Sequence, residues 1–254
     1  MRFIFTGTGT SQGIPVIGCT CQTCTSQDTR DQRSRTAAVI QSEDTSLAID
    51  VGPDFRHQML AVNIRSLSAI LLTHEHNDHI AGLDDVRPFN FLQKEPMQVY
   101  GLARVLNDVK RRFAYIFANE SYPGAPTVVL NELNAYQSII LAGIEVQTFL
   151  VHHGNLDVLA FRIGDVSYVT DANHIPPKSL EVIKGSKVLV LNALHHKTHH
   201  SHFNLAQALE LTDSLDVNSV YFTHMSHHMG LHRQIQDTLP EGRFLAYDGL
   251  EIHL

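Results

Sequence analysis

The chain has 254 residues, of which 43% are hydrophobic and 18% charged, a composition typical of a globular protein. No linker-like stretch or internal repeat divides it, so we predict one domain over residues 1–254. Because the net charge is −7, we do not expect the protein to bind nucleic acid. There is no 18-residue apolar run to cross a membrane and no apolar signal segment at the start, so we expect a cytoplasmic protein without membrane partners.

Histidine and cysteine are used unusually. There are 17 histidines, almost as many as the 19 Lys plus Arg, and the 3 cysteines all fall between Cys19 and Cys24. An odd and clustered set of cysteines does not make a disulfide framework. Neutral imidazole and thiolate are the usual zinc ligands, so the composition already points to metal binding.

The hydrophobic pattern predicts an α/β fold. Short apolar runs, many of them β-branched, predict strands near Arg2–Thr6, Thr36–Gln41, Ser46–Asp50, Ala69–Leu72, Met97–Tyr100, Ile144–Val151, Val158–Ile163, Val166–Thr170, Val188–Leu191, Ser219–Phe222 and Glu251–Leu254. Helical spacing predicts helices near Pro53–Asn63, Val86–Leu92, Arg104–Phe113, Pro177–Ile183, Leu205–Ser214 and Leu231–Thr238. Alternation of strands and helices in both halves favours helices flanking β-sheet over a bundle or an all-β barrel.

Several predicted strands end on polar clusters. The strand ending at Leu72 is followed by Thr-His-Glu-His-Asn-Asp-His, and three later strands are followed by His152-His153, by Asp171 and by Thr223-His224. Four strand ends that each offer a metal ligand predict a site along one rim of a sheet.

The segment from Ala69 to His79 carries the densest set of ligands. Side chains alternate along an extended chain, so His74 and His76 point the same way. Asp78 and His79 follow where the chain turns. Two imidazoles followed by a carboxylate and a third imidazole are enough for parts of two adjacent metal sites.

This His-x-His-x-Asp-His motif resembles the signature of the metallo-β-lactamase-fold hydrolases. The resemblance implies a four-layer αββα sandwich with two divalent metal ions along one edge. It places His74, His76 and His153 at one metal, Asp78, His79 and His224 at the other, and Asp171 between the two. The ions could be zinc, manganese or iron, because ligands of this kind discriminate poorly.

One ligand position has an alternative. Gly154 follows His153 as in the family's His-Gly turn, which favours His153 over His152 as the ligand. We expect His152 to face the opposite side of the strand end.

The cysteine cluster predicts a third metal site. Cys19, Cys21 and Cys24 supply three thiolates, and a closed tetrahedral zinc site needs a fourth ligand. His227, three residues after His224, is the best candidate, which makes this a structural zinc site. The alternative is a set of unligated buried thiols.

A narrower resemblance comes from Gly7-Thr-Gly9-Thr-Ser-Gln-Gly-Ile-Pro15, the cysteine cluster and Thr223-His224-Met-Ser-His227. Together they resemble the cyclic ribosyl-phosphate phosphodiesterases of the carbon–phosphorus lyase pathway. This implies hydrolysis of a small cyclic or sugar phosphodiester, such as 5-phosphoribosyl 1,2-cyclic phosphate, by a metal-bridging hydroxide. A homodimer is a family-level expectation.

The same resemblance suggests further residues near the chemistry. Asp78 and Asp171 would be catalytic as well as metal-binding, and His202 would stabilise the developing charge or protonate the leaving alkoxide. The alternative for His202 is a surface histidine at a helix start. Asp50 could accept a hydrogen bond from a ligand imidazole or serve the turn, and Arg87 is expected to pair with Asp84 or Asp85 rather than with a phosphate.

Other activities share the motif. A tRNA 3′-processing endoribonuclease has the same core, but this chain has no Gly/Pro-rich arm for tRNA. A thioesterase or lactonase of the same fold is an alternative, since a metal-activated water attacks carbonyls as well as phosphorus. A non-enzymatic binding protein is disfavoured by the complete ligand set.

Overall fold

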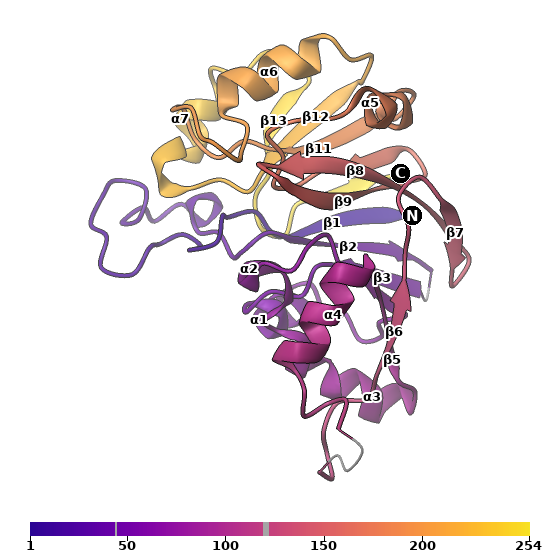
Figure 1. Cartoon of the computed structure of the whole chain (residues 1–254). Helices are drawn as coiled ribbons and strands as arrows, with labels where there is room; N and C mark the ends of the chain where they lie inside the picture. Colours follow the sequence, from indigo (N-terminus) through magenta and orange to yellow (C-terminus); the bar gives the residue numbers. More distant parts are fainter. Residues whose placement is uncertain (44, 119–121) are drawn as a thin grey trace.

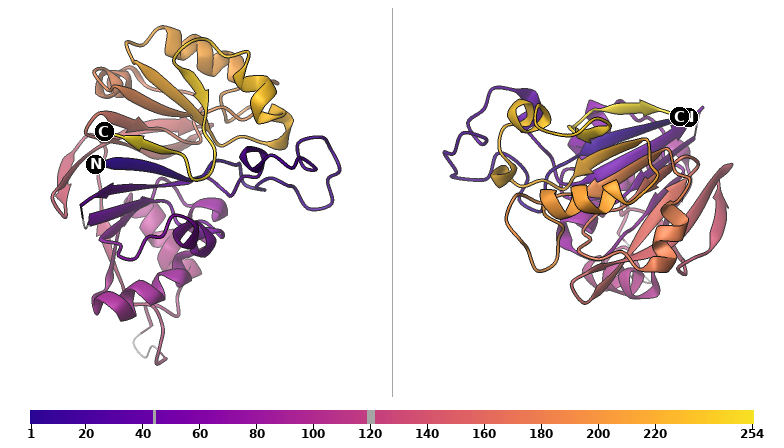
Figure 2. Two further views of the ribbon diagram at one scale, coloured as in Figure 1. Left: turned by 180° about the vertical axis from the view of Figure 1, so that it is seen from behind. Right: turned by 90° about the horizontal axis from the view of Figure 1, so that it is seen from above.

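The computed structural model describes residues 1–43, 45–118 and 122–254, and it contains two seven-stranded sheets that face each other (Figure 1). The first sheet has the order β14-β1-β2-β3-β4-β5-β6. Its strands are β1 (Arg2–Gly7), β2 (Ala37–Ser42), β3 (Thr45–Ile49), β4 (Ala69–Leu71), β5 (Met97–Gly101), β6 (Val128–Glu132) and β14 (Glu251–His253). The antiparallel pairing of β14 with β1 places the two ends of the chain side by side (Figures 1 and 2).

The second sheet has the order β13-β12-β11-β10-β9-β8-β7. Its strands are β7 (Ser138–Leu141), β8 (Ile144–His153), β9 (Leu156–Ile163), β10 (Val166–Tyr168), β11 (Val188–Asn192), β12 (Ser219–Thr223) and β13 (Arg243–Leu245). Strands β10 to β13 are parallel, as β3 to β6 are in the first sheet, so each sheet has several carboxyl ends on a common rim.

Helices cover the outer face of each sheet (Figure 1). The first sheet is covered by α1 (Phe55–Ala61), α2 (Asn77–Ile80), α3 (Arg87–Gln93) and α4 (Ala103–Arg112), and the second by α5 (Pro177–Ile183), α6 (Leu205–Asp213) and α7 (His232–Gln236). Short 3₁₀ helices lie at Thr29–Asp31, Leu83–Val86 and His227–Met229. None of the described helices is long and apolar enough to span a bilayer.

Three apolar cores hold the layers together. The alternation of side chains along β1 sends Phe3 and Phe5 into the core between the sheets and Ile4 into the core under the helices. The third core lies between the second sheet and α5, α6 and α7 and contains Phe149 and Phe222. Four layers around three cores make the αββα sandwich, and the predicted fold class is confirmed.

The sequence prediction of elements missed several short ones. Strands β6, β7 and β13 and helix α2 were not predicted. Strands β6, β7 and β13 are edge strands of their sheets, and they have only five, four and three residues respectively. Their structure depends on pairing with a neighbour, which a local pattern does not reveal.

The segment between β1 and β2 extends away from the sandwich (Figures 1 and 2). It contains the three cysteines, and its Ile17 side chain is fully exposed. The base of the segment is tied to the second half of the chain: the Thr10 amide donates to the Met225 carbonyl, and the buried Arg33 guanidinium donates to the Ala246 carbonyl.

Candidate metal centre

The ligand-type side chains converge at the carboxyl ends of strands from both sheets. His74, His76, Asp78 and His79 follow β4 and continue into α2, while His153 ends β8. Asp171 follows β10 and His224 follows β12. Asp171 and His224 have left-handed backbones, with φ of 55° and 57°. Such conformations are unfavourable for residues other than glycine and persist where the surroundings fix them, often at functional sites.

The first group contains His74, His76 and His153, and one nitrogen from each lies within 4.8 Å of the others. Nε2 of His74 is 3.0 Å from Nδ1 of His76. Nδ1 of His153 donates to the Ser201 carbonyl at 2.8 Å, which leaves Nε2 of His153 free to face the group. A backbone contact of this kind fixes which ring nitrogen can bind a metal.

The second group contains Asp78, His79 and His224, again with ligand atoms within 4.8 Å of one another. Nε2 of His79 lies 3.3 Å from the Asp78 carboxylate, and Nε2 of His224 lies 3.7 Å from it. The His79 and His224 rings are nearly parallel, with centroids 6.0 Å apart. The Asp78 side chain is 12% exposed, so this group is closed on most sides.

Asp171 lies between the two groups. One of its carboxylate oxygens is 3.4 Å from Nε2 of His79, and the other is 3.2 Å from Nε2 of His224 and 3.9 Å from Nε2 of His74. The residue is 2% exposed. A carboxylate that touches both groups at once is placed to bridge two cations.

Asp50 and Thr73 support the ligands from behind. Nδ1 of His79 donates to Asp50 at 2.6 Å, and the Thr73 hydroxyl donates to the same carboxylate at 2.8 Å and lies 3.0 Å from Nδ1 of His74. Both alternatives for Asp50 are observed, because its carboxylate accepts from His79 and also from the Thr73 backbone amide at 2.8 Å. Carboxylate partners of this kind orient metal-binding imidazoles.

Gly52 is a supporting residue that the sequence analysis missed. A Cβ on Gly52 would lie 2.1 Å from the carbonyl oxygen of Asp78, so only glycine lets this loop pack against α2. The loop and α2 are joined by a 2.7 Å hydrogen bond from the Val51 amide to the His79 carbonyl. The signal in the sequence was a glycine directly after a buried Asp50-Val51 pair.

The charges in the cluster are strongly coupled. Burial opposes ionisation of Asp171, but the neighbouring His224 and His79 outweigh it and hold the pKa of the carboxyl well below its usual range. Burial likewise opposes charge on His79, yet Asp171, Asp78 and Asp50 raise its pKa well above the ordinary value. The site is therefore built to stabilise positive charge next to carboxylates.

His202 lies next to both groups. It is 7% exposed, and its ring centroid is 4.5 Å from that of His153 and 4.8 Å from that of His224. Burial and the neighbouring His224 lower the pKa of His202 to about 2, so its imidazole is neutral near pH 7. A nitrogen of His202 also lies within 4.8 Å of ligand atoms of His153 and Asp171, which places it at the reacting position or beside a cation.

Unpartnered buried atoms test whether the site fits cations. Within the described part of the chain, Nε2 of His79 and both ring nitrogens of His224 are buried without a hydrogen-bond partner. Leaving buried polar atoms unpaired costs about 1–3 kcal/mol each. Imidazole nitrogens and carboxylate oxygens are good ligands for zinc, manganese and iron, so the donor set fits two divalent cations.

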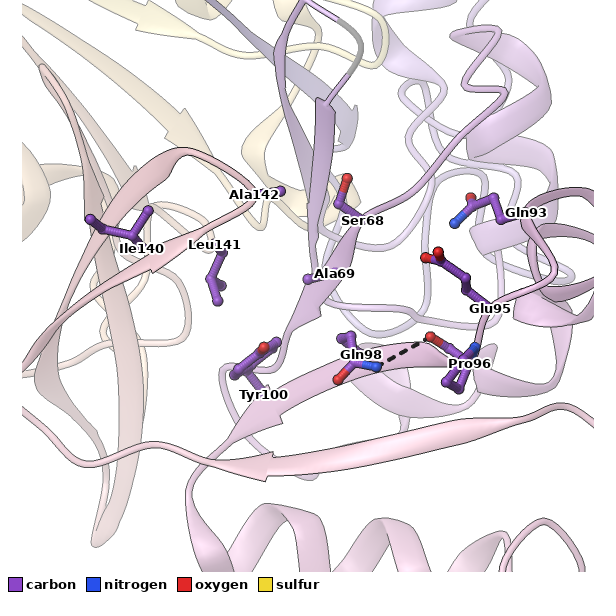
Figure 3. A pocket seen from close by; sticks show the side chains of 10 residues that line it. All are labelled: Ser68, Ala69, Gln93, Glu95, Pro96, Gln98, Tyr100, Ile140, Leu141 and Ala142. Carbon is purple, nitrogen blue, oxygen red and sulfur yellow. Dashed lines mark hydrogen bonds between the residues drawn. The ribbon is translucent and has the colours of Figure 1, made fainter.

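A cavity of about 560 Å³ opens onto the first group and is lined by His76, His153, Gly154, Asn155, Leu156, His200 and Ser201. This volume suits a small molecule. Another cavity, of about 520 Å³, lies beside the starts of β4 and β5 (Figure 3). There Ile140 and Leu141 of β7 lie across the cavity from Gln98 and Tyr100 of β5, and the metal-type side chains His74 and His76 follow the opposite end of β4.

The remaining predicted residues lie as follows. His152 faces away from the site: its Nδ1 is 3.0 Å from Asp157, and its ring stacks on His174. Arg87 forms an ion pair with Asp84, the alternative that the sequence favoured over a phosphate contact. The structure therefore brings the seven predicted active-site ligands and His202 together and leaves these two outside.

The cysteine cluster forms a separate group with His227. Nδ1 of His227 lies 3.4, 3.3 and 3.5 Å from the sulfurs of Cys19, Cys21 and Cys24 respectively. Zinc–sulfur and zinc–nitrogen bonds in tetrahedral geometry put about 3.6 Å between the two ligand atoms, so these spacings fit a zinc ion. A backbone hydrogen bond from Cys24, followed by contact with His227, lowers the pKa of the Cys21 thiol to about 6. The lowered pKa favours the thiolate form of Cys21, whereas burial raises the pKa of the neighbouring Cys24 thiol to about 11.

Comparison with known proteins identifies the family. A family model described as a beta-lactamase superfamily domain matches residues 45–225, which include all seven predicted active-site ligands, and the chain belongs to this superfamily. More narrowly, it belongs to the PhnP family, since a crystal structure of a diphosphatase from that family is 35% identical, with a TM-score of 0.93, and covers 100% of this chain and 97% of that one. Both steps of the resemblance predicted from the sequence are confirmed.

Other relatives differ in what they share with the chain. Zinc-bound PqqB from Methylobacterium extorquens has a TM-score of 0.82 over 100% of both chains at 16% identity, which shows a common fold. An octanoyltransferase from Porphyromonas gingivalis is 37% identical over 253 residues, covering 99% of this chain and 51% of that protein. The chain spans about half the length of the curated relatives it matches.

Proposed function

We propose that the chain is a metal-dependent phosphodiesterase acting on a small cyclic or sugar phosphodiester, such as 5-phosphoribosyl 1,2-cyclic phosphate. The observation that carries this proposal is the position of Asp171 between two groups of imidazole and carboxylate ligands. Membership of the PhnP family supports it. The cavity over His76 and His153 has room for a sugar phosphate but is small for a folded RNA.

Seven side chains would hold two cations at the rim of the sandwich: His74, His76 and His153 at one, Asp78, His79 and His224 at the other, and Asp171 at both. Bound divalent cations would offset the charge of the phosphoryl oxygens and lower the pKa of an attacking water molecule. Asp50 and the Ser201 carbonyl would keep the His79 and His153 rings turned toward the cations.

His202 would act on the leaving group. Its neutral imidazole carries one N–H, which can donate to the oxygen that leaves phosphorus. An anionic phosphodiester in contact with the ring raises its pKa, because an opposite charge favours the protonated form. When substrate binds, the ring would take up a proton from solvent, pass it to the leaving oxygen and return to its neutral form.

The cluster of Cys19, Cys21, Cys24 and His227 would hold a structural zinc. Three thiolates and one imidazole complete a tetrahedral set and leave no position for substrate. The zinc would fasten the extended segment between β1 and β2 to the loop after β12, which also carries His224.

A second candidate activity is cleavage of a phosphoric anhydride, because the 35% identical relative is described as a diphosphatase. The two activities differ in their leaving groups. A phosphate leaves more easily than an alkoxide, so it depends less on a proton from His202. Replacement of His202 should therefore slow diester hydrolysis far more than anhydride hydrolysis.

Metal analysis with a substrate panel tests the proposal. The panel contains bis(p-nitrophenyl) phosphate, cyclic nucleotides, 5-phosphoribosyl 1,2-cyclic phosphate, a sugar diphosphate, an octanoyl thioester and precursor tRNA. We expect metal-dependent turnover to be highest on the cyclic ribosyl phosphate. Preferential turnover of the diphosphate, the thioester or the tRNA would contradict the phosphodiesterase assignment and select one of the alternatives.

A further inference from the structure

Strand β9 has an edge that its neighbour in the second sheet covers only in part. Strand β10 is paired with β9 as far as Tyr168, which lies opposite Phe161. Backbone groups of alternate residues along a strand point to the same edge, so the Leu159 amide and the Asp157 carbonyl face this edge beyond the end of β10. Backbone donors and acceptors at such a position need partners from elsewhere in the chain.

Two groups from the first half of the chain take this place beside β9. The Leu159 amide donates to the Thr73 carbonyl at 3.0 Å. Arg104, near the start of α4, donates from Nη2 to the Asp157 carbonyl at 2.5 Å and from Nη1 to the Glu75 carboxylate. Thr73 and Arg104 together stand in for a neighbouring strand, and they connect the two sheets at this point.

The contacts of Arg104 lie on both sides of the first metal group. Glu75 is the residue between His74 and His76 on the loop after β4. On β8, the residue before His153 pairs in register with Asp157. The group therefore takes two imidazoles from one side of the connection and one from the other, so its geometry depends on how firmly the loop after β4 is held against β9.

Arginine is suited to this connection. Its planar guanidinium carries several N–H donors in a rigid fork, which can satisfy a carboxylate and a carbonyl at once. The Glu75 side chain is 19% exposed, and within the described part of the chain its Oε2 is buried without a hydrogen-bond partner. An enclosed carboxylate is costly without an opposite charge, so Glu75 and Arg104 hold each other in one geometry.

The second metal group is connected across the sheets by other contacts. The Met225 amide donates to the Thr8 carbonyl at 3.0 Å, and the Thr10 amide donates to the Met225 carbonyl at 2.9 Å. Met225 directly follows His224, so these bonds hold the ligand from the second sheet against β1 and its following loop. Loss of the Arg104 contacts should therefore disturb the first group more than the second.

We propose that Arg104 is a positioning residue that clamps the loop after β4 against β9 and so sets the affinity of the first group for its cation. The inference rests on the proposed function, because it assumes a cation in that group. Arg104 contacts Glu75 and Asp157 rather than a ligand ring, so it acts through the two backbone segments that carry the rings.

Zinc binding by Arg104→Gln, measured in competition with a chromophoric chelator, tests the proposal. The matched control is Arg111→Gln, since Arg111 lies on the same helix, pairs with Asp108 and has a side chain that is 74% exposed. We expect one of the two active-site dissociation constants to rise about fivefold or more in Arg104→Gln and the other to stay within about twofold. Arg111→Gln should leave both constants within about twofold, and Arg104→Lys should recover only part of the loss, because an ammonium lacks the fork.

Anomalous diffraction from Arg104→Gln crystals grown with limiting zinc identifies the weakened site. We expect the lower occupancy among His74, His76 and His153. Unchanged dissociation constants, an equal rise in both, or lower occupancy beside His79 and His224 would overturn the proposal.

Amide hydrogen exchange of the metal-free protein tests the clamp without a cation. The Leu159 amide crosses between the sheets, whereas the Leu72 and Val169 amides donate within their own sheets. We expect Leu159 to exchange about fivefold faster or more in Arg104→Gln, and the other two amides to stay within about twofold. An unchanged Leu159, or an equal change in all three amides, would overturn the clamp. If no zinc binds at the active site, the proposed function fails, and the exchange rates still decide the clamp.

Discussion

The two ligand clusters of this protein are built in opposite ways. The cluster around Asp171 lies at the rim of two sheets, contains only imidazoles and carboxylates, and opens onto a cavity beside His76. The cluster around His227 lies in a segment that extends from the sandwich, and it contains three thiols and one imidazole. An open site can accept a substrate, whereas a filled tetrahedral set cannot. We therefore propose that the first cluster performs the chemistry and that the second fastens the extended segment.

The contacts that hold the ligands in place also differ between the two clusters. Asp50 and the Ser201 carbonyl orient the rings of the first cluster, so their positions do not depend on a metal alone. Among the described residues, the cysteine sulfurs contact mainly His227 itself, and the Val16 amide donates to the sulfur of Cys24. Loss of metal should therefore loosen the second cluster more than the first.

The largest effect is expected for Asp171→Asn. Losing the charge that joins the two groups weakens the binding of both cations. We expect the loss of about 4 kcal/mol of transition-state stabilisation, which corresponds to a fall of about 10³-fold in kcat/KM. Steady-state hydrolysis and metal content measure it. Asp165→Asn, which removes an exposed carboxylate paired with Lys187, is the matched control and should be unaffected. Full activity of Asp171→Asn would remove the basis for assigning chemistry to the first cluster.

His202→Ala should give the next largest effect. Without its N–H the leaving alkoxide lacks a proton donor, so kcat should fall about 10²-fold or more while both cations are retained. Kinetics on an alkoxide diester and metal analysis on the same sample measure it, with His253→Ala on β14 as the control. Loss of a cation together with activity would show instead that His202 is a metal ligand.

Cys24→Ser should separate the two clusters. We expect the variant to hold one zinc fewer per chain, to lose about 2 kcal/mol of stability, corresponding to a decrease of roughly 4–8 °C in Tm, and to keep kcat within about twofold. Metal analysis, thermal unfolding and kinetics measure the three quantities. Unchanged zinc content would favour the alternative of unligated thiols.

The smallest effect is expected when the pH is lowered, and it acts through His232 at the base of the extended segment. Burial, followed by the charge of Arg33, lowers the pKa of His232 to about 4, below its ordinary value of about 6.5. The unfolded chain then binds more protons than the folded one between these pH values, so stability falls as pH falls through this window. Through this ring, the free energy of unfolding of the protein should fall by about 2 kcal/mol between pH 6.5 and 4.5.

Denaturant unfolding of the metal-free protein at a series of pH values measures this dependence. The slope should be smaller in His232→Asn, and His57→Asn, which changes an exposed histidine on α1, should leave it unchanged. Equal slopes in His232→Asn and the original protein would contradict the assignment.

The sequence predicted the parts that are carried by strong local patterns. The apolar runs and the polar clusters at their ends were enough to predict an α/β fold and to nominate His74, His76, Asp171 and His224, whereas the four-layer sandwich was implied by the family resemblance. Parallel strands place their carboxyl ends on one rim, so ligands far apart in the sequence could be expected to meet. The extent of the domain and the cytoplasmic location stay predictions.

Features that depend on tertiary contacts could not be predicted. The edge strands β6 and β7 form by pairing with a neighbour, and the glycine requirement at position 52 comes from the Asp78 carbonyl pressed against it. The neutral state of His202 depends on its burial and on His224.

Anomalous diffraction from crystals of the metal-loaded protein tests the central claim most directly. The account predicts two peaks about 3.5–4 Å apart on either side of the Asp171 carboxylate, and a third among Cys19, Cys21, Cys24 and His227. It would be contradicted by a fully loaded crystal in which no peak lies beside Asp171, or in which the His79 and His224 rings turn away from that carboxylate.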